Sequence, residues 1–265
     1  GNVTKQYVYE KGRLVALKNN NTIVAKFAYD NIGNCTHYKQ DETTPANMEW
    51  ERGNLLKKYT DAKAIYSYNS QGIRFQKEVG EEKEITTYFL DGGKLLAERK
   101  GDRRLRFTYD QDGILGVQLI YQDIEHYGEG GLYHYVKDGS GNVVALMDSG
   151  DAVALYEYDT WGKCKVLNPD GTENKDSKFI GNINPTRWKS QYYDTESGFY
   201  YIDGRYYSPE IRRYISAENP ERAMTNAGTL YGLNLYLLCL TNPVGMVYNG
   251  YTIETNAEMS YDAPK

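Results

Sequence analysis

The sequence lacks a long apolar run, and no stretch approaches the ~20 consecutive apolar residues that a membrane-spanning helix needs. It also lacks an excess of positive charge, because 31 basic residues against 36 acidic ones give a net charge of -5. A nucleic-acid-binding domain normally carries a basic face. We therefore expect neither a membrane span in this chain nor a nucleic-acid partner.

One basic run stands against this balance. Four cations lie between Lys100 and Arg106, but Asp102 interrupts them. We interpret the run as a solvated turn, with a phosphate site as the alternative.

Cysteine is scarce. The odd number of three, with no CxxC spacing, does not suit a disulfide framework. The three histidines lie apart from the cysteines in the sequence, so a metal site is not predicted either. We expect no metal and no cofactor, and a packing role for Cys35, Cys164 and Cys239.

Proline, phenylalanine and tryptophan are also rare, at 7, 6 and 3 residues, whereas there are 27 tyrosines and 26 glycines. Tyrosine favours strands, and glycine favours the tight turns between them. Helical periodicity is weak before about residue 221. The composition predicts an all-β fold. Because the chain starts with Gly1 rather than Met, we expect it to be a segment of a longer protein.

A unit of about 20 residues recurs: an aromatic residue, any residue, Tyr, an acid or amide, and then Gly within a few positions. Its clear copies begin at Phe27, Tyr66, Phe107 and Tyr156. The marker glycines occupy positions 12, 33, 53, 72, 93, 113, 141 and 162. Such regular spacing is typical of a repeat protein.

Each part of the unit has a physical role. Residues two apart on a strand share a face, so the two rings lie side by side. The Asp or Asn accepts a backbone hydrogen bond and starts a turn, and the glycine supplies the positive φ of a hairpin loop. We predict sequential antiparallel β-hairpins in a curved or spiral sheet, with their tyrosines packed against it; a glycan-binding platform of rings is the alternative. The predicted turn glycines are Gly33, Gly53, Gly72, Gly113 and Gly162.

The pattern changes after residue 180. The segment contains Ile180-Gly-Asn-Ile-Asn-Pro185, Tyr193-Asp194, Arg205-Tyr-Tyr-Ser-Pro209 and Arg213-Tyr-Ile-Ser216. It resembles the repeat-associated core of bacterial RHS/YD-repeat proteins. The positions that match this core motif are Arg187, Tyr193, Asp194, Gly198, Tyr200, Tyr201, Arg205, Tyr206, Tyr207, Pro209, Arg213 and Ser216.

The resemblance implies a shell of hairpins that, in polymorphic toxins, encloses a C-terminal effector, with the core segment closing one end. Other members of the family lie at cell surfaces and mediate contact or glycan binding. The implied location is therefore secreted or at the bacterial cell surface. The implied partners are the protein's own C-terminal effector or neighbouring repeats, with a glycan or a cell-surface protein as the alternative.

We predict three regions: YD/RHS hairpin repeats over 1–175, a mixed plug formed by the RHS core over 176–220, and a degenerate tail over 221–265. The tail is too short to fold as a toxin domain. Residues 229–240 suit a short helix or a buried strand. We expect the fragment to self-associate through its N-terminal edge near residues 7–17, or to cap that edge with this tail.

Some family members cleave themselves beyond the core with paired aspartates. Here Ser208, Tyr248 and Asn249 stand at positions of the expected Asp-Pro motifs. Aspartyl cleavage needs two carboxylates that share protons. We therefore expect a structural scaffold with no catalytic residue; a carbohydrate- or protein-binding module is the alternative, and an autoprocessing protease is the weaker one.

The charged core residues are expected to be structural. The three arginines Arg187, Arg205 and Arg213 should stack on rings or pair with Asp194 and Glu210. Asp194 and Glu196, two residues apart in a turn, should cap backbone amides.

Overall fold

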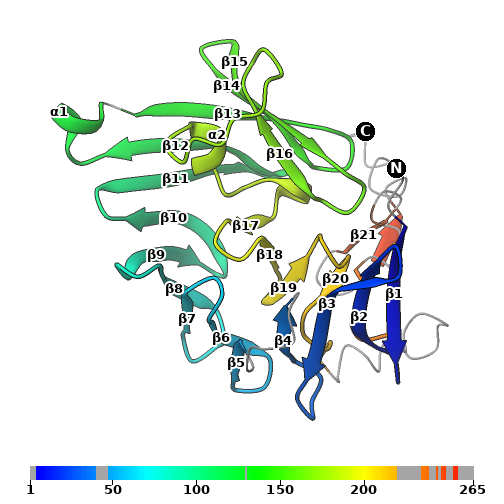
Figure 1. Ribbon diagram of the computed structural model, residues 1–265. Coiled ribbons are helices and arrows are strands. Elements are labelled where there is room, and N and C mark those ends of the chain that lie inside the picture. Colours follow the sequence, from blue (N-terminus) through cyan, green and yellow to red (C-terminus); the bar gives the residue numbers. More distant parts are fainter. Residues whose placement is uncertain are drawn as a thin grey trace, which may run out of the picture. The chain divides into compact units, whose positions relative to one another are not determined.

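The computed structural model describes residues 4–39, 47–128, 130–219, 234–238, 243, 246–248 and 253–255. The chain divides into two compact units (Figure 1). The first contains residues 1–65 and 205–265, and the second contains residues 66–204. The fold is all-β, as the repeat pattern predicts.

The second unit is built on strands β8 to β16, which pair antiparallel in sequence order (Figure 1). Each strand pairs with the next along the chain, as sequential hairpins require. The strands are β8 (Arg74–Val79), β9 (Glu84–Asp91), β10 (Lys94–Lys100), β11 (Arg103–Asp110), β12 (Gly113–Tyr121), β13 (Gly131–Lys137), β14 (Val143–Asp148), β15 (Asp151–Tyr158) and β16 (Cys164–Leu167).

The core segment of this unit is short and mixed, as the resemblance implies. Its elements are α2 (Ile180–Ile183), the 3-10 helix η1 (Trp188–Ser190), β17 (Tyr192–Asp194) and β18 (Phe199–Ile202). A further short helix, α1 (Ile124–Tyr127), connects β12 to β13.

The first unit contains a four-stranded antiparallel sheet in sequence order, followed by further hairpins. The sheet consists of β1 (Lys5–Glu10), β2 (Arg13–Asn19), β3 (Thr22–Tyr29) and β4 (Cys35–Lys39). The other strands are β5 (Met48–Glu51), β6 (Leu55–Tyr59), β7 (Ala64–Tyr68, at the division between the units), β19 (Arg205–Ser208), β20 (Arg213–Tyr214), β21 (Met246–Tyr248) and β22 (Ile253–Thr255).

The repeat turns have the local chemistry that the sequence predicts. The side chain of Asp30 accepts the backbone N–H of Ile32, and Asp159 accepts that of Trp161, each two residues on. The five turn glycines have φ of 95°, 93°, 80°, 123° and 88°, in the left-handed region that favours glycine. They are Gly33, Gly53, Gly72, Gly113 and Gly162.

Strand alternation gives the sheet of the second unit a covered and an open face. On β11, Leu105 and Phe107 are buried, whereas Arg106 and Thr108 are exposed. The inward side chains form one hydrophobic core with Ile180 and Ile183 of the core segment. The core segment therefore covers one face of the repeat sheet.

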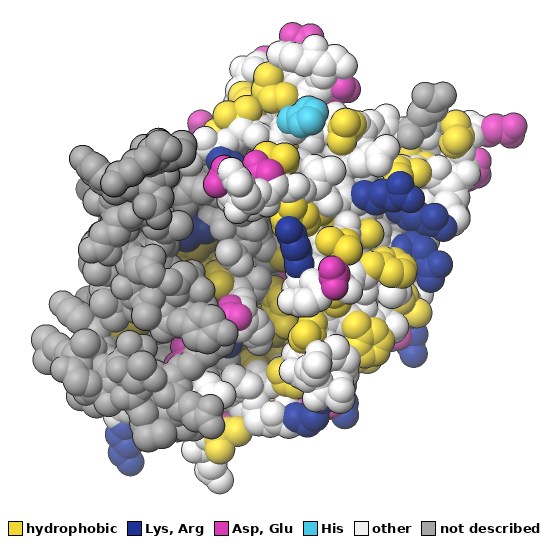
Figure 2. Space-filling view, turned by 180° about the vertical axis from the view of Figure 1, so that it is seen from behind, with side chains coloured by type: hydrophobic (Ala, Val, Ile, Leu, Met, Phe, Trp, Pro, Cys, Tyr) yellow, Lys and Arg dark blue, Asp and Glu magenta, His cyan; other side chains and the backbone are white. Residues whose placement is uncertain are grey.

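The opposite face keeps large apolar side chains in solvent. Figure 2 shows hydrophobic side chains interspersed with Lys and Arg over much of the described surface. Several strands contribute exposed apolar residues, namely Phe75, Ile85, Phe89, Leu96, Leu115, Leu132 and Val136.

The structure describes few residues of the predicted tail, residues 221–265. Residues 234–238 form a turn rather than part of the short helix or buried strand expected over 229–240, and Tyr236 and Leu238 are buried there. The Tyr236 hydroxyl donates to the Gly33 carbonyl at 2.7 Å, so the described tail contacts the first repeat turn. Most of residues 221–265, including Cys239, lies outside the described residues.

The other two cysteines are free thiols. Cys35 is buried, and burial raises its pKa to about 12; Cys164 is half-buried. None of the described helices has the length and apolarity that crossing a bilayer requires.

Candidate functional site

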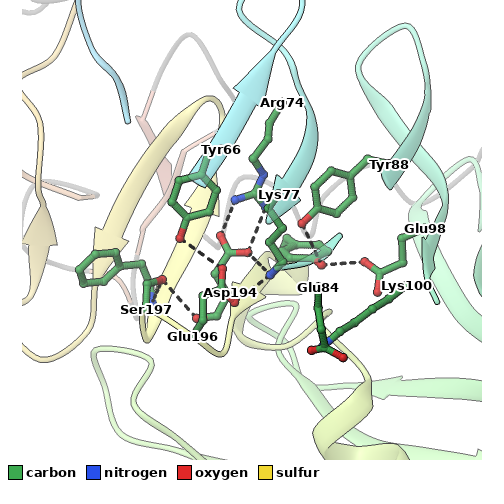
Figure 3. A network of polar contacts seen from close by, with 12 residues as sticks. Tyr66, Arg74, Lys77, Glu84, Tyr88, Glu98, Lys100, Asp194, Glu196 and Ser197 are labelled. Carbon is green, nitrogen blue, oxygen red and sulfur yellow. Dashed lines mark hydrogen bonds and ion pairs between the residues drawn. The ribbon is translucent and has the colours of Figure 1, made fainter. Parts of the chain in front are cut away.

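A buried carboxylate of the core segment binds a guanidinium of the repeat sheet. Arg74, the first residue of β8, donates from Nη1 to Oδ2 of Asp194 at 2.6 Å and from Nη2 to Oδ1 at 3.2 Å. Such a two-point pairing fixes orientation as well as charge. It joins β8 to the end of β17 (Figure 3).

A second cation completes the cluster. The Nζ of Lys77 lies 2.8 Å from Oδ1 of Asp194 and 2.8 Å from Oε2 of Glu196. The four side chains are nearly closed to solvent, with 2% exposure for Arg74, 9% for Lys77, 0% for Asp194 and 7% for Glu196. Two positive and two negative charges balance, which is the condition for burying them.

The pKa values follow from this balance. Burial alone would raise the pKa of Asp194, but the charges of Arg74 and Lys77 outweigh it and hold this pKa below its ordinary value. Burial likewise disfavours the Lys77 ammonium, yet Asp194 and its neighbours leave the pKa of Lys77 raised. Both groups therefore stay ionised at neutral pH.

Tyrosine rings surround the Arg74 guanidinium. Its central carbon lies 4.3 Å from the ring centre of Tyr201, 5.0 Å from that of Tyr88, 5.3 Å from that of Tyr192 and 5.4 Å from that of Tyr66. The Tyr66 hydroxyl also donates to Oε1 of Glu196 at 3.2 Å. The rings of Tyr66 and Tyr88, which belong to the repeats, thus pack around a buried cation. This supports the interpretation that the repeat tyrosines pack inside the fold.

At its edge the network reaches another acid. The Tyr192 hydroxyl donates to Oε2 of Glu98 on β10 at 2.6 Å, and the Tyr88 hydroxyl lies 3.3 Å from that of Tyr192. Glu98 is 4% exposed, and burial raises its pKa.

Arg187 organises a second buried cluster in the same unit. Its guanidinium lies 4.6 Å from the Tyr193 ring centre and donates to the carbonyls of Asn184 and Asn182, each at 3.2 Å. Nearby, the Tyr200 hydroxyl donates to the carbonyl of the turn residue Gly162 at 2.9 Å. Core residues therefore hold a repeat turn in place.

Two further core arginines lie in the first unit. Arg205 lies 3.8 Å from the ring centre of Tyr214, and its Nη1 contacts Oε2 of Glu218 at 2.7 Å. Arg213 lies 4.8 Å from the Tyr9 ring centre and donates to the Tyr9 hydroxyl at 2.9 Å. All three core arginines contact rings.

The other predicted core positions are packed into the interior or into turns. Gly198 has φ of 72°, and its N–H donates to the Asp194 carbonyl at 2.8 Å. The buried remainder comprises Tyr206, Tyr207, Pro209 and Ser216.

One detail of the expected charge roles is wrong. Asp194 and Glu196 do not serve as amide caps, because their carboxylates bind Arg74 and Lys77. Glu210 forms an ion pair with Lys5, at 2.7 Å. Arg74 and Lys77 are not predictable as site residues, because polar strand residues usually face solvent and nothing in their local sequence indicates burial.

Both carboxylates of the network are engaged by cations. Within the described part of the chain, no group of three or more His, Cys, Asp or Glu side chains could hold a metal. The carboxylates of Asp194 and Glu196 already bind cations, which leaves them poorly placed to exchange protons with a substrate.

Sequential hairpins with one sheet face covered by a core segment, and joined to it by buried ion pairs, define a β-hairpin repeat fold. Solved structures share this fold. The chain matches the TcdB2-TccC3-TEV crystal structure with a TM-score of 0.54 and 18% identity, over 94% of this chain and 13% of the other. It matches a Tc holotoxin pore of Photorhabdus luminescens with a TM-score of 0.53 and 18% identity, over 99% and 13%.

Sequence relatives include a nuclease and a toxin. The tRNA3(Ser)-specific nuclease WapA of Bacillus spizizenii is 35% identical over 158 residues, which are 58% of this chain and 6% of that protein. The double-stranded DNA deaminase toxin A of Burkholderia cenocepacia is 29% identical over 117 residues, or 44% and 7%. No protein-family model matches the chain. The chain thus spans a small part of these relatives, and the similarities support an RHS-type protein.

Proposed function

We propose that this chain is the repeat-and-core segment of a secreted or surface-displayed bacterial YD-repeat protein, a scaffold rather than an enzyme. Hairpin repeats over 1–175 form the wall, the core over 176–220 plugs it, and the tail over 221–265 leads toward an effector. The partner of this scaffold is the protein's own C-terminal effector, which it encloses or positions.

The observation that carries the proposal is the buried contact of Arg74 and Lys77 with Asp194 and Glu196. It connects strand β8 of the repeat sheet to the core segment, which supports a role of the core segment as a plug. The relatives support it, because WapA and the deaminase toxin are named for effector activities while the chain matches only 6% and 7% of them.

Packing of the tyrosines favours the scaffold over a carbohydrate-binding platform. A platform needs rings exposed in a cleft, whereas Tyr66, Tyr88 and Tyr156 are 1%, 6% and 4% exposed. Their rings are therefore packed inside the unit, where a sugar cannot stack on them.

The test is limited proteolysis of the protein with its natural flanking sequence. We expect the segment beyond the core to resist a nonspecific protease while the repeats are folded, and to become sensitive in the Asp194→Asn variant. The matched control is Glu49→Gln, which removes an exposed partner of Lys58. Equal sensitivity of that segment in the wild type and the Asp194 variant would overturn the enclosing role.

A further inference from the structure

A cavity of about 380 Å³ lies beside the ion network of the second unit. Its wall combines residues of β8 to β11 with Lys175 and with core residues between 177 and 196. Small-molecule sites in proteins begin at about 300 Å³. The cavity is therefore large enough for a ligand of monosaccharide size.

The basic groups on its wall differ in how far they are already neutralised. Lys77 is held by Asp194 and Glu196, and Lys100 lies 2.6 Å from Glu84 (Figure 3). The Arg103 side chain has no hydrogen bond or ion pair with any residue that the structure describes, although its charge acts on Glu98 and lowers the pKa of that acid. Arg103 is thus a cation on the wall with its hydrogen-bonding capacity unused.

Strand geometry turns Arg103 toward the cavity. It lies on the same face of β11 as Leu105, which is 0% exposed, while Arg104 and Arg106 alternate to the other face. The interpretation of residues 100–106 as a solvated turn is therefore too simple. Only Gly101 and Asp102 form the turn, and Lys100 and Arg103 line the cavity.

An acid lies on the same wall. Glu98 accepts one hydrogen bond, from Tyr192, and no described cation lies within ion-pair distance of it. A carboxylate can accept several hydrogen bonds, and a guanidinium can donate five. The cavity thus offers an acceptor and a charged donor that the fold leaves available.

We propose that this cavity binds a small acid that also carries hydroxyl groups, which is the chemistry of an acidic sugar. The acid group, a carboxylate or a phosphate, pairs with Arg103, and a hydroxyl donates to Glu98. A simple anion could pair with Arg103, but it would bring a negative charge near Glu98 and offer no hydroxyl to donate to that carboxylate. A neutral sugar would offer hydroxyls but no negative charge to pair with Arg103. The two groups together select a ligand with both features.

Isothermal titration of the purified chain tests this site with four probes. Glucuronate and glucose 6-phosphate carry the acid together with hydroxyls, and they distinguish a carboxylate from a phosphate ligand. Glucose lacks the acid, and acetate lacks the hydroxyls. We expect saturable binding of glucuronate, glucose 6-phosphate or both, tighter than that of glucose and acetate. No saturable binding, or acetate binding as tightly as glucuronate, would overturn the proposal.

Variants locate the binding. Arg103→Gln should weaken it by roughly tenfold or more, the size expected for loss of a charge-assisted hydrogen bond. Arg106→Gln, three positions along the same strand and on the other face, should leave it unchanged. Glu98→Gln keeps an acceptor for Tyr192 and should weaken binding even if Arg103→Gln fails to fold. Equal effects of Arg103→Gln and Arg106→Gln, or full affinity in Glu98→Gln, would place the ligand elsewhere.

Discussion

Lys77 Nζ and Asp194 Oδ1 lie 2.8 Å apart, although the two residues are 117 positions apart in the chain. Their contact connects a repeat strand to the core segment, and Lys77 extends it to Glu196. Because both side chains are buried, water cannot replace either partner. The consequences of breaking this contact should therefore reach the whole second unit.

Replacing Asp194 with Asn should lower the free energy of unfolding by about 3–5 kcal/mol, because it removes the buried carboxylate charge that pairs with both Arg74 and Lys77. Urea unfolding followed by circular dichroism measures the change. The control variant Glu49→Gln breaks the exposed pair with Lys58, whose side chains are 58% and 42% exposed. It should cost less than about 1 kcal/mol. Equal losses in the two variants would contradict a buried network.

Glu98 should give the stability an unusual pH dependence. Its folded pKa is raised by burial above the unfolded value of about 4.3. The contribution of Glu98 to the free energy of unfolding is therefore fully present below about pH 4.3, and it is lost as the pH rises through the folded pKa. Glu98→Gln cannot ionise, so its stability relative to the wild type should increase between pH 4 and pH 8. Unfolding curves at several pH values would contradict this if the two proteins changed in parallel.

Two turn glycines should differ in their tolerance of a side chain. Both have positive φ, 123° at Gly113 and 88° at Gly162. A Cβ at Gly113 meets nothing within 4 Å, whereas at Gly162 it would lie 2.6 Å from the Trp188 ring. Gly113→Ala should cost about 1–2 kcal/mol from backbone strain alone, and Gly162→Ala about 1–3 kcal/mol more from the clash. Melting temperatures of the two variants provide the comparison, and similar values would argue against the Trp188 contact.

The purified chain should stay intact. Ser208, Tyr248 and Asn249 replace residues of the Asp-Pro motifs that self-cleaving relatives are expected to use. The two carboxylates that such cleavage needs are then not both present. Intact-mass measurement after long incubation at several pH values checks this, and a discrete fragment ending near residue 247 would refute it.

The Tyr236 contact predicts how the tail affects the first repeat. Tyr236→Phe removes a donor from the Gly33 carbonyl and should destabilise the chain by about 1–3 kcal/mol. Deleting residues 221–265 should destabilise it further and favour self-association through exposed strand edges. Chromatography with light scattering decides the second point. A monomer that keeps its stability after the deletion would show that the tail does not cover the strand edges of the first repeat.

Local chemistry was readable from the sequence by itself. Tyr-x-Tyr followed by an acid and a glycine sets a strand and then a turn within eight or so residues, so the all-β class and the turn at Asp159–Gly162 follow from neighbours in the chain. The motif over residues 187–216 likewise indicated a packed core segment. These features depend on backbone conformation and on alternation along one strand.

The partners of the buried charges were decided by the tertiary structure. Strict alternation on β8 would place Arg74 and Lys77 on opposite faces, since three positions separate them, yet both are buried against Asp194. The same holds for Glu98 and Arg103, which nothing in the local sequence assigns to one cavity. The partner of a buried charge can lie more than a hundred positions away in the chain. The packing of the whole unit, rather than any short sequence pattern, brings the two residues together.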